Sequence, residues 1–286
     1  MKTLKYFFSF FLIAGIAVQA AGQTEEAIKS DKLTLKWSTD KVFEVPESVY
    51  YDDERDVLYI ANIKGKPTDK DGNGYISKMK VNGEVIDLKW VTGINAPKGM
   101  GVYEDKLYVT DIDRLMEIDI SSGRIAAEYP AENAQFLNDI AVDEKGKVYV
   151  SDMMDTKVYR LSKGKFDVWL DDEILTGPNG LWVGDGHLYI GAKKIVKAGL
   201  KNGKAEVFAE KTGSIDGLEG TAKGGFLFSD WSGNMHYLSP GGEIEHIFDS
   251  SGMNINAADI EYIPSKGLIL VPTFFDNRVM GYGFVE

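Results

Sequence analysis

The segment Asn138–Asp152 reads NDIAVDEKGKVYVSD and contains one complete copy of the pattern that decides the fold. A polar residue begins the copy, a short apolar strand follows, acidic residues and glycine form a turn, and a second apolar strand ends it. Five further copies begin at Glu47, Lys98, Asn179, Asp216 and Asp259, at intervals of 37 to 51 residues. A repeat of this length predicts an array of similar β-rich units.

Each copy is followed by further candidate strands. In the quoted unit, the third strand covers residues 158–161 (VYRL) and the fourth covers residues 166–170 (FDVWL). Six units of four strands predict an all-β, six-bladed β-propeller over residues 33–286. The last unit ends at Glu286 without a clear fourth strand, whereas residues 33–37 (LTLKW) stand alone before the first unit. We therefore expect this N-terminal strand to close the last blade.

The N-terminal residues have the pattern of an export signal. Lys2 and Lys5 precede an apolar run from Tyr6 to Val18, and small residues follow it. This pattern predicts a signal peptide over residues 1–20, followed by a polar tether over residues 21–32. The run is short for a membrane span and no second one occurs, so we expect no membrane span and a periplasmic or secreted protein.

Charge and cysteine content exclude several classes of function. The formal charge of −12 becomes −14 without residues 1–20, because these contain two lysines and no acid. A chain this acidic is not expected to bind nucleic acid. The chain has no cysteine, which excludes thiol chemistry and disulfides. We expect a small-molecule substrate, and the sequence predicts no oligomeric state.

The first strand of each propeller blade lines the central axis, so the first residues of the six copies should form one ring. That ring reads Glu, Lys, Asn, Asn, Asp, Asp at positions 47, 98, 138, 179, 216 and 259. Its oxygen atoms suit a hard divalent cation. The alternative is that these residues cap strand starts and turns, where Asn and Asp are common.

Residues after the second strands should rim the same mouth, most of them by holding turns. These are Asn62, Asp111, Asp113, Asp152, Asp155, Asp230 and Trp231. The histidines fall elsewhere, with His187 in a far-side hairpin, His236 in a third strand and His246 in a fourth strand. None of the three is expected to act as a general base.

Four segments carry a resemblance to a known family: PES at 46–48, LND at 137–139, GPNGL at 177–181 and IDGL at 215–218. Over residues 40–286 the chain resembles the senescence marker protein, gluconolactonase and luciferin-regenerating-enzyme family of six-bladed propellers. The resemblance implies that Glu47, Asn179 and Asp216 bind a divalent metal and that Asn138 contacts substrate or metal. It further implies lactone hydrolysis, with Asp216 as both ligand and base. Calcium is the first expectation, with magnesium, zinc or manganese as alternatives.

Two residues depart from the family pattern. Phe136 stands where lactonases of the family often carry Arg, and Lys98 enters the ring. The ammonium of Lys98 could compete with a metal for a ring carboxylate, bind an anionic part of the substrate, or extend outward to solvent. We keep Lys98 as a candidate substrate-binding residue.

A second candidate calcium site lies in residues 69–77 (DKDGNGYIS), which match the first nine positions of a calcium-binding loop. Asp69, Asp71 and Asn73 would supply the ligands. Position twelve of that loop type is a bidentate Glu, and here it is Lys80. The alternative is a glycine-rich loop between the second and third strands of the first blade.

Three functions remain open at this stage. The first is an exported, metal-dependent hydrolase of sugar lactones or related esters. The second is a non-catalytic propeller that binds a small molecule, a glycan or a protein at the same mouth, which Lys98 and Phe136 favour. The third is a metal-free enzyme like the strictosidine synthase relatives, which Asn138, Asn179 and Asp216 together argue against.

Overall fold

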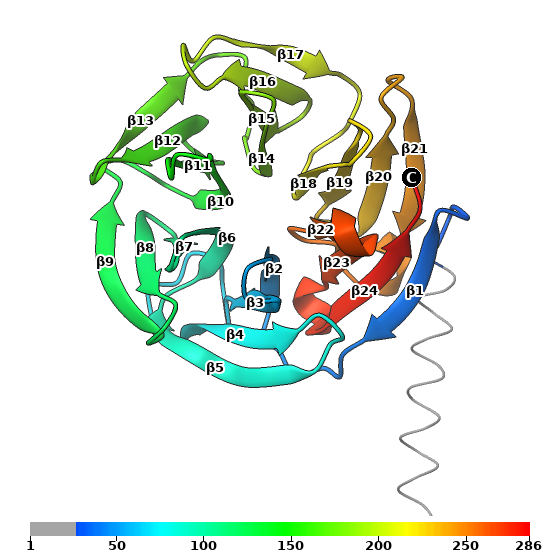
Figure 1. Cartoon of the computed structure of the whole chain (residues 1–286), viewed down its shortest axis with the longest axis horizontal. Helices are drawn as coiled ribbons and strands as arrows, with labels where there is room; N and C mark the ends of the chain where they lie inside the picture. Colours follow the sequence, from blue (N-terminus) through cyan, green and yellow to red (C-terminus); the bar gives the residue numbers. More distant parts are fainter. Residues whose placement is uncertain (1–26) are drawn as a thin grey trace, which may run out of the picture.

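The computed structural model describes residues 27–286, so the expected signal peptide and residues 21–26 of the expected tether lie outside it. The described chain forms six four-stranded antiparallel sheets arranged around a common axis (Figure 1). The all-β, six-bladed propeller expected from the repeat is confirmed. Within residues 27–286, no helix has the length and apolar character that a membrane span requires.

The first three blades follow the chain from the axis outward, so each blade's first strand is innermost. Blade one contains β2 (Pro46–Asp52), β3 (Val57–Asn62), β4 (Gly74–Lys80) and β5 (Val85–Ile94). Blade two contains β6 (Pro97–Tyr103), β7 (Lys106–Asp111), β8 (Arg114–Asp119) and β9 (Arg124–Pro130). Blade three contains β10 (Leu137–Val142), β11 (Val148–Asp152), β12 (Lys157–Ser162) and β13 (Lys165–Asp171).

Blades four and five have the same order, and blade six combines both ends of the chain. Blade four contains β14 (Leu181–Gly184), β15 (His187–Gly191), β16 (Ile195–Gly199) and β17 (Ala205–Ala209). Blade five contains β18 (Leu218–Gly220), β19 (Phe226–Asp230), β20 (Asn234–Leu238) and β21 (Ile244–Asp249). Blade six contains β22 (Glu261–Ile263), β23 (Leu268–Pro272), β24 (Val279–Phe284) and β1 (Leu33–Ser38). Short 3-10 helices cover Ser251–Met253 (η1), Pro264–Lys266 (η2) and Phe274–Asp276 (η3).

The N-terminal strand closes the ring as predicted. β1 pairs antiparallel with β24, from Leu33 opposite Phe284 to Ser38 opposite Met280. In Figure 1 the first strand therefore lies beside the last one. The C-terminal segment supplies three strands of blade six, β22, β23 and β24. β1 adds the fourth, outermost strand.

Residues 27–32, expected as part of a tether, instead pack on blade five. Ala27 is fully buried against Phe248, and its carbonyl oxygen accepts a hydrogen bond of 2.8 Å from the Asp249 amide. Ile28 forms a β-bridge with Phe248. The apolar Ala27 and Ile28 precede the polar residues 29–32, and burying them stabilises the docked position.

The core lies between neighbouring blades. One cluster joins Tyr59 and Ile76 of blade one to Leu107, Val109 and Met116 of blade two, and all five side chains are fully buried. Equivalent clusters occur at other blade interfaces. Because each blade buries both faces of its inner strands, the second strands read as continuous apolar runs such as LYI and VYV.

Near the axis the inner strands come too close for ordinary side chains at three glycines. A Cβ atom at Gly99 would lie 2.5 Å from the Cα of Asp139, and one at Gly180 would lie 2.5 Å from the carbonyl oxygen of Asp216. At Gly217 it would lie 2.4 Å from the amide nitrogen of Ile260. Each contact is with the backbone of the next blade, so these glycines permit the close approach that narrows the channel.

We expect Gly180→Ala to destabilise the protein by about 2–3 kcal/mol, because the added methyl group must displace backbone rather than a flexible side chain. Urea denaturation followed by circular dichroism measures the difference. Gly252→Ala is the matched control, since nothing lies within 4 Å of its Cβ position. Equal stability of the two variants would contradict this account of the glycine.

Candidate functional site

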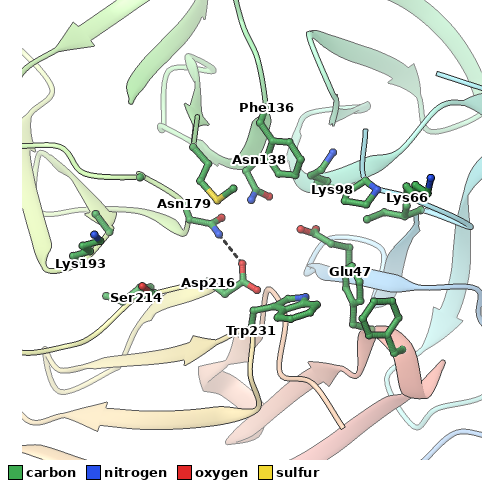
Figure 2. Close-up of a pocket in the computed structure, with 18 of the residues that line it drawn as sticks. Glu47, Lys66, Lys98, Phe136, Asn138, Asn179, Lys193, Ser214, Asp216 and Trp231 are labelled. Carbon is green, nitrogen blue, oxygen red and sulfur yellow. Dashed lines mark hydrogen bonds between the residues drawn. The ribbon is translucent and has the colours of Figure 1, made fainter. Parts of the chain in front are cut away.

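A cavity of about 520 Å³ opens at one end of the channel, and five of the six expected ring residues line it. We call it the mouth cavity. Its ring residues are Glu47, Lys98, Asn138, Asn179 and Asp216. They come from blades one to five, at or just before the innermost strands, as the repeat predicted. Figure 2 shows Glu47, Asn138, Asn179 and Asp216 directed toward one another.

Blade six departs from the expected ring. Asp259 does not line the mouth cavity, and the equivalent residue of blade six is Ala258. The carbonyl oxygen of Ala258 accepts a hydrogen bond from Ser229 of the preceding blade (2.7 Å), just as that of Asn138 accepts one from Thr110 (2.6 Å). Asp259 is therefore one residue past the ring position and points to the opposite side.

Glu47 and the pair Asn179–Asp216 provide the oxygen atoms of the site. The amide nitrogen of Asn179 donates to Oδ1 of Asp216 at 2.7 Å (Figure 2). The amide oxygen of Asn179 and Oδ2 of Asp216 take no part in this hydrogen bond. Oε2 of Glu47 is buried and has no hydrogen-bond partner among residues 27–286. An orphaned carboxylate oxygen at this place fits a cation ligand, because burying it alone costs about 1–3 kcal/mol or more.

The two carboxyl groups are held in an environment that disfavours their charge. Burial raises the pKa of Asp216 to about 7, and the nearby Asp139 adds to the rise, while the Asn179 hydrogen bond opposes it. Burial also raises the pKa of Glu47 well above its usual range, and Asp216 raises it further while Lys98 lowers it. A divalent cation would relieve this repulsion.

Lys98 is fully buried, with 0% of its surface exposed. Its ammonium donates to the carbonyl oxygen of Ala96 at 3.0 Å and lies 4.4 Å from the centre of the Phe136 ring. It forms no ion pair within 4.0 Å in the described part of the chain. Burial lowers its pKa to about 8, although Glu47 and Asp111 favour the charged form. The two departures from the family pattern, Lys98 and Phe136, are therefore in contact, and Lys98 does not extend to solvent.

Residues at the ends of the second strands anchor the segments that lead into the ring. In blades one to three, an Asn or Asp side chain accepts a hydrogen bond from a backbone amide two or three residues before the ring position. The pairs are Asn62 with Glu44 (3.2 Å), Asp111 with Ala96 (2.8 Å) and Asp152 with Phe136 (3.1 Å). Their expected role in holding turns matches these contacts. Of the seven residues expected at the rim, Trp231 alone lines the mouth cavity.

Several residues that line the mouth cavity were not predicted. They are Ile63, Gly65, Lys66, Pro67, Met153, Thr176, Gly177, Ala192, Lys193, Ser214, Ile215, Phe274 and Phe275. Most lie in the loops that follow the second strands, and the others lie in the segments that lead into β14 and β18, where the repeat carries no fixed pattern. Lys66 and Lys193 are exposed and lie on opposite sides of the view in Figure 2.

A second cavity of about 220 Å³, the far cavity, contains four acidic residues: Asp139, Glu219, Asp259 and Glu261. Burial raises the pKa of Asp139 to about 7, against two backbone hydrogen bonds that lower it. Burial raises the pKa of Glu261 to about 8 in the same way. Sequence reasoning missed this cluster, although Glu219 and Glu261 each follow a ring position by three residues.

The loop that resembles a calcium site lies between β3 and β4. Asp71 accepts hydrogen bonds from the Asn73 backbone (3.2 Å) and side chain (2.6 Å). β4 begins at Gly74, and the hydroxyl of Ser77 donates to the Leu88 carbonyl inside the blade. The three candidate ligands, Asp69, Asp71 and Asn73, lie in the loop before β4. Calcium binding there stays a prediction. Within residues 27–286, no three His, Cys, Asp or Glu side chains are arranged to hold a metal. The candidate ligands in the mouth cavity are instead two carboxylates, Glu47 and Asp216, and two amides, Asn138 and Asn179.

Comparison with known proteins supports the fold. No family model matches the chain, and no curated protein matches it in sequence. A streptogramin B lyase structure matches with a TM-score of 0.66 and 12% identity, covering 90% of this chain and 100% of that one. Virginiamycin B lyase from Staphylococcus aureus, in a catalytically inactive histidine-to-alanine variant with quinupristin, matches at 0.62 and 15%, covering 88% and 100%. A protein provisionally assigned as a gluconolactonase matches at 0.64 and 14%, covering 91% and 94%. At these identities the shared property is the propeller fold.

The raised pKa values predict an unusual dependence of stability on pH in the metal-free protein. A carboxyl group whose pKa is raised by folding stabilises the folded state below about pH 4, and this contribution is lost as the pH rises through the folded pKa. The pKa values of about 7 for Asp139 and Asp216 and about 8 for Glu261 place the loss between about pH 4 and pH 8. We expect the free energy of unfolding in a chelator to fall across this window.

Asp216→Asn should reduce that fall by at least about 1 kcal/mol, because one raised pKa is removed while the Asn179 bond can persist. Denaturant unfolding at several pH values measures it. The exposed Asp185→Asn is the control and should not change the slope. A wild-type stability that rises from pH 4 to pH 8 would contradict the assignment of buried, unpaired carboxylates.

Proposed function

We propose that this protein is an exported, divalent-metal-dependent hydrolase of lactones or related esters. The observation that carries the proposal is the buried, unpartnered Oε2 of Glu47, which shares one cavity with Asp216 and two amide side chains. Export is inferred from the N-terminal sequence pattern alone. Calcium is the favoured ion because carboxylate and amide oxygens are its usual ligands, with magnesium, manganese or zinc as alternatives.

Glu47, Asn179 and Asp216 would hold the ion, and Asn138 would contact the substrate or complete the ligand set. A bound divalent cation supplies Lewis-acid polarisation of the lactone carbonyl and stabilises the developing oxyanion. Asp216 orients the attacking water and takes its proton, and the Asn179 hydrogen bond fixes the direction of its carboxyl group. Its low exposure keeps bulk water from competing for these oxygens.

A histidine-dependent lyase is a weaker reading of the same fold. One matching lyase is catalytically inactive when a histidine is replaced by alanine. The mouth cavity of this chain has no histidine in its lining: His187, His236 and His246 lie on β15, β20 and β21. The acid and base of this cavity must therefore come from other side chains.

The second candidate function is non-catalytic binding at the same mouth. The observation in its favour is the buried ammonium of Lys98, which supplies a positive charge beside Glu47 without any added ion. A cation built into the protein lowers the need for a metal and would suit an acidic ligand. Metal content separates the two candidates.

Elemental analysis of the purified protein should find about one divalent ion per chain, and Glu47→Gln should lose most of it, because the substitution removes the orphaned charge. Asp185 is exposed and does not line the mouth cavity, so Asp185→Asn should keep the wild-type metal content. A metal-free wild-type protein after purification without chelator, with no recovery on adding calcium, would favour the second candidate.

Asp216→Asn should lower kcat for a responsive lactone by about 10²–10⁴, the range typical for removing a general base. A pH-stat assay over a panel of lactones measures the rate. Asp185→Asn should hydrolyse the same lactone at the wild-type rate. If the metal-loaded wild-type protein left the whole panel intact, the hydrolase proposal would be refuted.

A further inference from the structure

The walls of the mouth cavity differ sharply from its floor. The floor carries the polar ring residues, whereas the sides carry mainly apolar groups, with Thr176 and Ser214 as their uncharged polar exceptions. The larger apolar side chains are Ile63, Phe136, Met153, Trp231, Phe274 and Phe275. A polyhydroxylated ligand would meet few hydrogen-bond partners along these sides. Each hydroxyl pressed against them without a partner would lose about 1–3 kcal/mol of hydrogen bonding to water.

Three of these residues form one continuous aromatic wall: Trp231, Phe274 and Phe275. The Trp231 ring centre lies 5.5 Å from that of Phe274 and 5.7 Å from that of Phe275, both at 80°. The two phenylalanine rings are 4.8 Å apart at 86°. Edge-to-face contacts of this kind orient the rings relative to one another.

The aromatic wall is anchored although much of it is exposed. Trp231 is 47% exposed and Phe275 is 61% exposed. The backbone oxygen of Trp231 accepts a hydrogen bond of 2.7 Å from Asn256. η3 carries both phenylalanines, and Asn277 is its C-cap residue. The side-chain oxygen of Asn277 accepts a hydrogen bond of 2.9 Å from the Val45 amide. The wall therefore has contacts on its protein side and none covering its outer face in the described chain.

Phe274 adopts a backbone conformation that is unfavourable for a bulky residue. Its φ of 48° lies in the left-handed region, which costs about 1–3 kcal/mol for such a side chain. Strain together with exposed aromatic surface beside a cavity is typical of a ligand contact. The cavity volume of about 520 Å³ lies within the range of small-molecule sites.

We infer that the ligand of the mouth cavity is a lactone or ester bearing an apolar substituent, an alkyl chain or an aromatic ring, rather than a polyhydroxylated sugar lactone. The substituent packs against Trp231 and Phe275 while the ester group reaches the polar floor at Glu47 and Asp216. This inference rests on the proposed hydrolase function. Lys66 and Lys193, exposed at the opening, stay in water.

Three six-membered lactones test the inference with the same reacting group. δ-Decalactone carries a pentyl chain, δ-valerolactone carries no substituent, and glucono-δ-lactone carries hydroxyl groups. We expect kcat/KM for δ-decalactone to exceed that for glucono-δ-lactone by about tenfold or more, since a few buried methylene groups account for that difference. A higher kcat/KM for glucono-δ-lactone overturns the inference and leaves the hydrolase proposal standing.

Trp231→Ala and Phe275→Ala should each reduce the ratio of kcat/KM for δ-decalactone over δ-valerolactone by about tenfold. Phe275 is the more exposed of the two, so its variant remains informative if Trp231→Ala folds poorly. The matched control is Phe208→Ala, an exposed aromatic on β17 outside the mouth cavity, which should keep the wild-type ratio. An unchanged ratio in both wall variants overturns the inference.

Binding separates this inference from the hydrolase proposal. If no lactone is hydrolysed, δ-decalactone should still raise the Tm of the wild-type protein, and glucono-δ-lactone should not. That result refutes hydrolysis and supports the apolar ligand. A Tm that neither compound changes, in a protein that hydrolyses neither, overturns both.

Discussion

The close approach of the inner strands around the axis is the constraint on which the rest of the molecule depends. Gly99, Gly180 and Gly217 each face the backbone of the next blade at a distance that excludes a Cβ atom. The residue before each glycine lines the mouth cavity. The constraint that narrows the channel thus also brings side chains from five blades into one small space.

Charge is the second consequence of this crowding. The two cavities together hold six carboxyl groups, and Lys98 is the one lysine among their lining residues that is buried. Burial raises the pKa of all six, so each group ionises only at a higher pH than an exposed carboxyl group would. The six are Glu47, Asp139, Asp216, Glu219, Asp259 and Glu261. A cation at the mouth would lower the free-energy cost of ionising Glu47 and Asp216. The effect would extend to Asp139, whose charge already acts on Asp216.

The repeat predicted the blades, their closure by β1 and five positions of the ring, because these follow from strand periodicity. It misplaced the blade-six ring position by one residue, at Asp259 instead of Ala258. β22 is only three residues long, and its copy of the pattern, Asp-Ile-Glu, begins with an acidic residue one position after the ring position. The polar Asp259 was more conspicuous than the small Ala258 before it. The aromatic wall was predicted only at Trp231, because Phe274 and Phe275 belong to a 3-10 turn outside the repeat. Loop residues carry no periodic signal, and tertiary structure alone brings them to the cavity.

Joining β1 to β24 has a consequence for how the chain reaches its native state. The paired residues Leu33 and Phe284 lie about 250 positions apart, so this sheet requires the longest loop closure among the strand pairs of residues 27–286. Five blades can assemble from neighbouring segments, whereas the sixth must wait until the opposite end of the chain is present. β1, the first strand of the described chain to be synthesised, is then among the last to find its partner, and until it does, β24 presents an open edge.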